Sequence, residues 1–539
     1  MLYNMSWLAE GKPFPPLEER QRLDRYAQNA LMFDSEHFSD PHFRHREHGV
    51  TDKFMTLAMY DSCAKRISQV IGNFEDVVSF PVLLNYQKFI STKMADLVAG
   101  EHPLITGKNP EENAKLKWVT DATNFYEKLY SIVIDLSRFG DCPIRVYKDE
   151  YTDYYDFTIW DAGQWFPIVM QDGTYRISKH CLAWLENRSE DSKKDYYLHV
   201  QVYDVHTPES IEYYVFHNGS EGSKIGKLES KTIIATGFTT CPVFNLRPYA
   251  VSGTVFGYDD YVPIDAVLAE IITRVSQISA ILDKHADPAM TGPMSMLKKD
   301  PRSGEFYLER SKFYGINEDD TPPSYLTWDG QLTAAFSQLE FLINQLYTLS
   351  EMGAAITGGV DSSGNAVSGT AMRFKMVNPL AKARRVTNSL TDPMRKLLSV
   401  LCSNLPDIDE ETAEPGDGED TKLPYGHISI QWKDGLPDDP REGLEMAKLA
   451  SGEVKMLPLE EALMTYLNKS QAEATQLAQK VRELALEAMQ QQAEMAQQTA
   501  SNPNKSGPQD GTGVNPRKKG SKTGMNNFQS ENNKTQNDK

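Results

Sequence analysis

Four histidines near the start of the chain are the residues best suited to metal chemistry. His42, His45 and His48 follow one another at intervals of three, with His37 close by. In a helix this spacing brings side chains near one face, where imidazoles could share a zinc ion. Organised cysteine or carboxylate ligands are missing nearby, so we expect surface histidines and no metal. A metal-dependent nuclease is the alternative, which metal-stimulated DNA cleavage would reveal.

Motifs of the common enzyme classes are missing. The glycine-rich segment 353–369 lacks the lysine that a nucleotide phosphate-binding loop needs. Neither a GxSxG nucleophile elbow nor an HExxH metal motif occurs in the sequence. We therefore expect a protein that is not an enzyme and that uses no cofactor.

Charge separates one stretch from the rest of the chain. The net charge is −19 over 539 residues, whereas a sequence-independent DNA binder is normally basic. Residues 373–396 reverse this sign, with Asp392 as their single acid. Their cations are Arg373, Lys375, Lys382, Arg384, Arg385, Arg395 and Lys396. Such a helix is either a solvated or salt-bridged subunit surface, or the lining of a channel.

The cysteines and the apolar runs indicate where the protein is made. The five cysteines are Cys63, Cys142, Cys181, Cys241 and Cys402. They form no CxxC pair and no disulfide framework, so we expect reduced thiols. The first residues lack the regions of a signal peptide, and nowhere do 18 apolar residues run together. We expect no membrane span and assembly in a cytoplasm.

The first half of the chain reads as helices followed by strands. Residues 16–131 are mostly helical, with an amphipathic start and further helices at Lys53–Ile71 and Asn113–Leu136. From Cys142 to Pro248, β-branched and aromatic segments alternate with turn signals, which predicts an antiparallel β module. Its predicted strands are Tyr154–Trp160, Gln164–Met170, Thr174–Ser178, Tyr196–Tyr203 and Ile211–His217.

A helix, a small insert and a second helix come next. Pro263–Lys284 and Gln331–Glu351 both show apolar residues at helical spacing. The insert, Ala289–Trp328, is rich in proline and glycine and holds two short strand candidates, Glu305–Leu308 and Lys312–Tyr314. From pattern alone this unit is equally an ordinary helical hairpin.

The remaining segments alternate between flexible and helical patterns. Four glycines besides the closing one disfavour regular structure across Gly353–Gly369, which is either a functional loop or a linker. A long helix should start at Thr370 and bend near Pro379 and Pro393. An acidic loop (406–419) and a strand (427–432) follow, and then helices from Glu442 to Gln498. The polar tail from Ala500 should be disordered.

The order of these elements resembles the portal family, the head–tail connectors of tailed double-stranded DNA bacteriophages. The resemblance covers about Met1–Gln498 and is clearest in LINQLYTLSEMGAAITGG…AVSGTAMRFK. It implies an α+β fold in an elongated subunit. The segments would be a wing (1–255), a first stem helix (256–288), a clip (289–328), a second stem helix (329–352), a tunnel loop (353–369), a kinked helix returning to the wing (370–441), a crown (442–499) and a disordered tail (500–539).

The resemblance also implies a function. Portal proteins form rings, usually of twelve subunits, at one capsid vertex of the virion, and DNA is packaged and ejected through them. Expected partners are a terminase motor, tail adaptor proteins and the major capsid protein, with no membrane. Twelve copies would carry −228 (12 × −19), which disfavours tight DNA binding. The residues expected to face DNA are Thr357, Gly358, Gly359, Val360, Asp361, Ser362, Ser363, Gly364 and Asn365.

The basic helix has two possible places in such a ring. Arg373, Lys375, Lys382, Arg384 and Arg385 would meet acidic neighbours at a subunit interface or line the channel above the loop. The alternative to a portal is a self-associating virion scaffold that does not conduct DNA.

Overall fold

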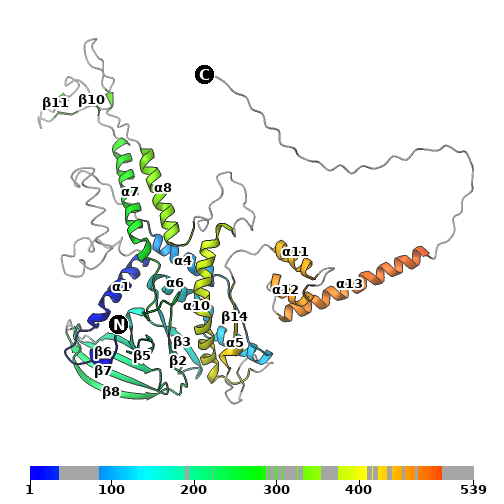
Figure 1. The fold of residues 1–539 in the computed structure, drawn as a ribbon, viewed down its shortest axis with the longest axis horizontal. Helices are drawn as coiled ribbons and strands as arrows, with labels where there is room; N and C mark the ends of the chain where they lie inside the picture. The colour runs from blue at the N-terminus through cyan, green and yellow to red at the C-terminus, as the bar shows by residue number, and fades with distance from the viewer. Residues whose placement is uncertain are drawn as a thin grey trace, which may run out of the picture. The chain divides into compact units, whose positions relative to one another are not determined.

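The chain forms two separate units that combine helices with antiparallel sheets. They are Met1–Pro437 and Asp438–Lys539. The computed structural model describes residues 1–34, 84–188, 194–220, 222–286, 290–291, 298–299, 306–307, 324–325, 332–353, 374–408, 415–416, 423–433, 440–451, 456–467 and 471–500. The predicted α+β class is confirmed (Figure 1). The histidines at 37–48, the helix at Lys53–Ile71 and the tail from 501 lie outside the described residues.

The first unit contains helices throughout its length and strands mainly in the middle. Its helices are α1 (Arg20–Asp34), α4 (Tyr86–Ala99), α5 (Pro110–Ala122), α6 (Phe125–Phe139), α7 (Val262–Ala286), α8 (Leu332–Leu349) and α10 (Val377–Leu401). Its longer strands are β2 (Cys142–Lys148), β3 (Tyr155–Ile159), β4 (Trp165–Val169), β5 (Ile177–Asn187), β6 (Tyr196–Asp204), β7 (Ser210–Gly219), β8 (Lys227–Ala235) and β9 (Val243–Leu246). The shorter ones are β1 (Leu104–Thr106), β10 (Met290–Thr291), β11 (Lys298–Lys299), β12 (Phe306–Tyr307), β13 (Ser324–Tyr325) and β14 (Ser429–Gln431).

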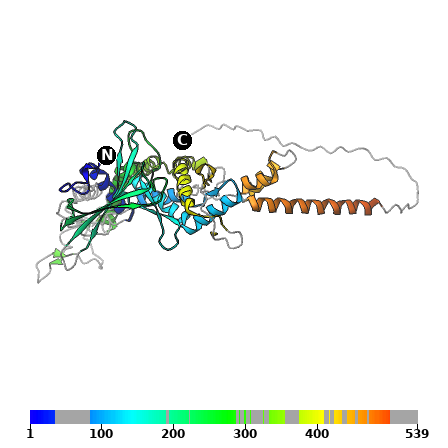
Figure 2. The ribbon, with the colours of Figure 1, turned by 90° about the horizontal axis from the view of Figure 1, so that it is seen from below.

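A five-stranded antiparallel sheet is the largest β layer among the described strands (Figure 2). Its strand order is β4-β5-β6-β7-β8. One of its faces packs against the N-terminal residues Leu2, Trp7 and Phe14. The same N-terminal segment covers the β4 edge, where Leu2 bridges to Ile168. The opposite edge, β8, is exposed along its whole length.

Most predicted strands are confirmed with small shifts, one begins and ends elsewhere, and three further strands were not predicted. The strand predicted at Thr174–Ser178 instead begins at Ile177 and continues to Asn187. Strands β2, β8 and β9 were not among the predicted ones. Because β8 is exposed on both faces, it lacks the apolar–polar alternation on which strand prediction depends. The strand predicted at 427–432 is β14, which pairs with β1.

The helical stretch predicted at Asn113–Leu136 is divided into α5 and α6. Asn109 caps α5 by accepting a hydrogen bond from the Glu112 N–H (2.8 Å), and Pro110 occupies the first turn. The chain breaks at Asn124, which has a left-handed φ of 50°. Asparagine tolerates this conformation better than most residues, so the break is consistent with the residue present there.

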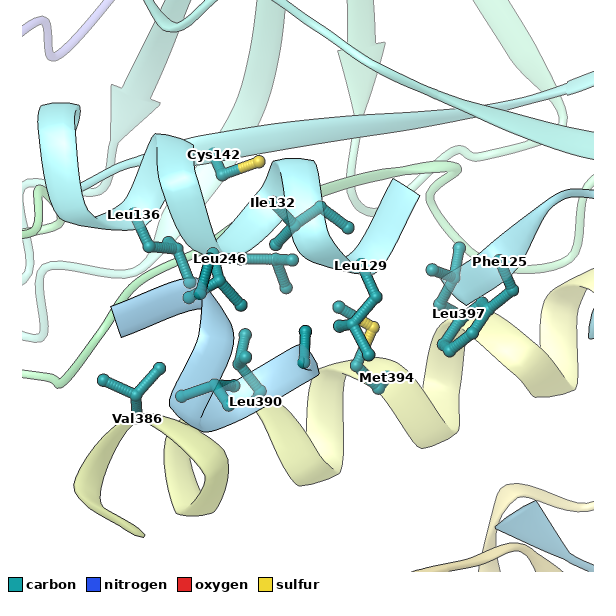
Figure 3. Close-up of a cluster of buried hydrophobic side chains, with 14 of the residues drawn as sticks. Phe125, Leu129, Ile132, Leu136, Cys142, Leu246, Val386, Leu390, Met394 and Leu397 are labelled. Carbon is teal, nitrogen blue, oxygen red and sulfur yellow. The ribbon is translucent and has the colours of Figure 1, made fainter. Parts of the chain in front are cut away.

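The core of the first unit lies between α4, α6 and α10. Leu129, Ile132 and Leu136 of α6 face Leu390 and Met394 of α10 in one buried cluster (Figure 3). Cys142 and Leu246 of the small sheet β3-β2-β9 complete it on another side. Burying a large apolar side chain contributes roughly 1.5–3 kcal/mol. The cluster therefore fixes α10 firmly to the helices of the N-terminal half.

Helix α10 differs from its predicted course at the N-terminus. The helix starts at Val377, after a turn at Met376 that separates it from helical residues Phe374 and Lys375. The interruption lies before Pro379, near which a bend was expected. Pro379 itself lies in the first turn of α10, where proline removes no helical hydrogen bond. Pro393 lies inside the helix, as predicted. The predicted start at Thr370 falls outside the described residues.

The second unit consists of α11 (Pro440–Ser451), α12 (Leu459–Leu467) and α13 (Gln471–Ala500). Small buried side chains, including Ala450, Ala462 and Ala474, let these helices approach closely. At 1.5 Å per residue the 30 residues of α13 span about 45 Å. The helical prediction for 442–498 is confirmed by these three helices in the described residues.

Candidate functional site

Helices α7 and α8 form a hairpin whose two helices lie side by side (Figure 1). Both were predicted, at Pro263–Lys284 and Gln331–Glu351, and both are confirmed with bounds shifted by one or two residues. Leu339, Leu342 and Ile343 of α8 pack against the core cluster that also contains Ile264 and Ile271 of α7. In the insert between the helices, β12 lies inside the predicted strand Glu305–Leu308. The second strand candidate, Lys312–Tyr314, lies outside the described residues.

The start of α7 is fixed by Asp259. Its carboxylate accepts hydrogen bonds from the N–H groups of Tyr261 (3.0 Å) and Val262 (2.9 Å), so Asp259 caps the helix. It also pairs with Arg25 of α1 at 3.0 Å. Burial raises the pKa of the Asp259 carboxyl, while the Arg25 charge opposes that rise. The sequence carries a signal for this cap, since two aspartates stand just before Pro263.

A second carboxyl lies in the first turn of α7, and within the described part of the chain no cation pairs with it. Asp265 is 4% exposed, and its closest polar partner is the Gln87 amide, 3.4 Å away. Burial raises the pKa of Asp265 to about 7, and the Gln87 hydrogen bond only partly offsets this. A neutral carboxyl at low pH thus becomes a buried charge as the pH rises.

The segment before α7 passes very close to the end of α6. Gly140 ends α6 with φ +78°, and a Cβ added there would lie 2.6 Å from the Tyr258 carbonyl carbon. A Cβ on Gly257 would lie 1.8 Å from the Gly140 oxygen. Only glycine fits at either position, so the segment that leads into α7 is held tightly against the end of α6.

The turn after α8 brings the chain back to α10. Glu351 and Gly353 have left-handed φ values of 60° and 66°, and Met352 between them is fully buried. A Cβ on Gly353 would lie only 3.8 Å from the Lys375 carbonyl oxygen. The two flanks of the glycine-rich segment therefore lie next to each other. The predicted DNA-facing residues Thr357–Asn365, and Arg373, lie outside the described residues.

Lys382 connects these elements from inside the subunit. Its ammonium lies 2.7 Å from Asp260 Oδ1 and donates to the Ser350 carbonyl oxygen at 2.9 Å. The Ser137 hydroxyl of α6 donates to Asp260 Oδ2 (2.7 Å). Lys382 is only 6% exposed. It therefore departs from the expectation that it contributes to a channel or subunit surface, because its charge is used within the subunit.

Three further cations of the basic helix lie at the surface. Lys375, Arg384 and Arg385 are exposed. Arg385 pairs with Glu351 at 2.7 Å and lies over the Tyr249 ring, 5.5 Å from its centroid. Within one helical turn of α10, Lys382 thus makes a buried contact and Arg385 an exposed contact to the residues that follow α8.

Reactive groups are not gathered into a catalytic arrangement in the described residues. Among them, no three His, Cys, Asp or Glu side chains come together to hold a metal. Burial raises the pKa of the Cys181 and Cys402 thiols to about 12, which makes their reactive thiolates scarce. No helix within the described ranges is long and apolar enough to cross a membrane.

The fold and this site define a structural subunit that presents a two-helix hairpin and holds a glycine-rich segment by both ends. Residues 81–499 match the family of phage portal proteins of the SPP1 Gp6-like type, and the chain belongs to this family. The resemblance seen in the sequence is thereby confirmed. A search of curated proteins gave no match.

Two solved structures with a similar arrangement come from gene transfer agent particles. One is the virion of a native gene transfer agent particle, with a TM-score of 0.40, 10% identity, and coverage of 75% of this chain and 92% of the other. The second is the neck of an empty particle of this kind, solved with C6 symmetry, with a TM-score of 0.41, 10% identity, and coverage of 75% and 93%.

Proposed function

We propose that this protein is a portal subunit that assembles into a ring, usually of twelve copies, at one vertex of a phage capsid. DNA would be packaged and ejected through the central channel. The family match over residues 81–499 carries this proposal. The chain itself would perform no catalytic step, because ATP hydrolysis belongs to a separate terminase motor.

Exposed apolar side chains on the hairpin support assembly with further copies. Phe336 and Phe341 of α8 are 50% and 59% exposed, and Leu282 of α7 is 49% exposed. Large aromatic side chains that remain accessible in a single subunit are typical of contact surfaces. In a ring these side chains would be buried against the neighbouring subunit, because one face of each subunit contacts a different face of the next.

The glycine-rich segment would be the part that meets DNA. Residues Thr357–Asn365 would contact the phosphate backbone loosely, because uncharged Gly, Ser and Asn offer hydrogen bonds without a positive charge. Lys375, Arg384 and Arg385 would lie at the subunit interface or along the channel. The insert between α7 and α8 would bind terminase during packaging and tail adaptor proteins afterwards, while the capsid surrounds the ring.

Electron microscopy of the purified protein, combined with particle mass, tests the assembly. Rings with a central hole wide enough for duplex DNA are expected. A monomer or compact dimer at high concentration would contradict the portal proposal. Solid assemblies without a channel would support the virion scaffold instead. Deletion of residues 354–373 then tests the loop, because packaging and DNA retention should both fall.

A further inference from the structure

We propose that Lys382 is a positioning residue that locks the foot of the α7–α8 hairpin to α10 and thereby sets where the glycine-rich segment leaves and returns. The consequence for DNA rests on the portal function proposed above, whereas the structural lock does not. Lys382, Asp260 and Ser350 are called the foot contact below.

The foot contact joins both ends of the hairpin through one side chain. Asp260 lies two residues before α7 begins, and Ser350 directly follows α8. The Lys382 ammonium reaches both, at 2.7 Å and 2.9 Å. An ammonium has three donors in a compact head, so one lysine can bind two acceptors from different segments. Movement of either hairpin end away from α10 must break one of these contacts.

The foot contact is anchored to the rigid part of the subunit. Asp260 is held by α6 in two ways, because its N–H donates to the Ser137 carbonyl (2.8 Å) and its carboxylate accepts from the Ser137 hydroxyl. Ser137 in turn contacts Ser91 of α4 at 3.0 Å, and Ser91 contacts the Tyr261 hydroxyl at 2.8 Å. The network therefore runs from the helices of the core to the first residues of the hairpin.

Burial makes the foot contact strong and directional. Ser350 is 2% exposed and Lys382 is 6% exposed, so water competes little for either group. A buried charge that loses its partner is costly, so the ammonium is constrained to this geometry. One turn further along α10, Arg385 holds Glu351 at the surface. The turn leading into the glycine-rich segment is thus held twice from α10, once inside and once outside.

Hydrogen exchange of the purified protein, whatever its oligomeric state, tests the positioning role. Lys382→Met should accelerate amide exchange about tenfold or more in two peptides, one spanning 346–353 and one spanning 257–262, because Lys382 joins Ser350 and Asp260 to α10. Exchange in α4 and in β6 should stay unchanged. The matched control is Lys179→Met, which removes a Lys–Asp pair in the sheet (2.8 Å to Asp204) and should leave both peptides as in the native protein.

A double variant separates positioning from stability. Lys382→Met with Asp260→Asn removes the half-buried Asp260 carboxylate that the single variant leaves without its cation, so subunit stability should recover toward that of the native protein. The Ser350 oxygen still lacks its donor, so exchange in peptide 346–353 should stay fast. If the double variant recovered both its stability and the slow exchange of peptide 346–353, the positioning role would be overturned. Exchange that is unchanged, or accelerated throughout the subunit, in Lys382→Met would overturn it as well. If the single variant does not fold, the double variant is measured alone by the same criteria.

DNA retention links the foot contact to the loop. Particles assembled with the double variant should lose packaged DNA faster than those with Lys179→Met. If deletion of 354–373 leaves retention unchanged, the proposed role of the loop fails, while the exchange result still decides the foot contact. If the deletion has an effect but the double variant retains DNA like the control, the foot contact does not govern the loop.

Discussion

The core cluster and the outer part of the hairpin meet opposite physical demands. Leu390 and Met394 of α10 are fully buried among side chains from α6, and no neighbouring subunit is needed to cover them. Phe336 and Phe341 of α8 are at least half exposed in the single chain. The difference teaches that the buried cluster stabilises the subunit, whereas the exposed face of α8 provides contact surface.

The largest expected effect comes from removing volume in the core. Leu390→Ala should lower the free energy of unfolding by about 2–5 kcal/mol, because a cavity replaces a fully buried side chain. Urea unfolding followed by tryptophan fluorescence measures this, since Trp118 and Trp432 pack against the cluster. The control Leu282→Ala, on the exposed part of α7, should change unfolding by less than about 0.5 kcal/mol. Equal effects would remove the contrast between the two regions.

A smaller effect, dependent on pH, is expected where the two regions join. The Asp265 pKa is raised to about 7 from its usual 3.8, so its cost is absent below pH 4, grows between pH 4 and 7, and is constant above pH 7. Asp265→Asn cannot ionise, and it should stabilise the subunit by on the order of 2–4 kcal/mol at pH 8 and by nothing at pH 4. Thermal or urea unfolding across this range measures the difference.

The control for this pH effect is an exposed carboxylate with the opposite shift. Hydrogen bonds from Thr174 lower the pKa of Asp172, so that its contribution disappears only as the pH falls below the usual range. Asp172→Asn should therefore give the same difference from the native protein at pH 5 and at pH 8. A flat profile for Asp265→Asn as well would show that Asp265 is not buried as a charge.

The smallest effect on stability should accompany a large effect on assembly. Phe341→Ser should change the free energy of unfolding of the subunit by less than about 0.5 kcal/mol, because the phenyl side chain is exposed in the single chain. Sedimentation velocity should nevertheless show weaker ring formation, by tenfold or more in concentration. Glu340→Ser, at the adjacent exposed position, should assemble normally. Normal rings from Phe341→Ser would place the subunit contact elsewhere.

Periodic patterns were sufficient to predict the hairpin. The apolar spacing of α7 and α8, with Pro263 at the helix start, gave both helices within one or two residues. The family resemblance followed from the order of such elements. Local patterns were equally sufficient for most strands, because aromatic and β-branched segments alternate with turn residues there.

Pairings between distant segments could not be predicted in the same way. Lys382 stands among six other cations in the sequence, and only the packing of α10 against the hairpin buries it beside Asp260. The division between α5 and α6 depends on one left-handed residue, Asn124, within an otherwise helical pattern. The proposed DNA-facing role of Thr357–Asn365 stays a prediction.

The exposed β8 edge has a consequence for a protein made in many copies. Unpaired strand backbones can join those of other molecules and begin an aggregate. Charged side chains at Lys227, Glu229 and Lys231 stand along this edge, whereas the N-terminal segment covers the β4 edge. Sheet growth is thus blocked by chain at one side and discouraged by charge at the other. Subunits can then accumulate at high concentration without fibrils competing with the assembly of ordered oligomers.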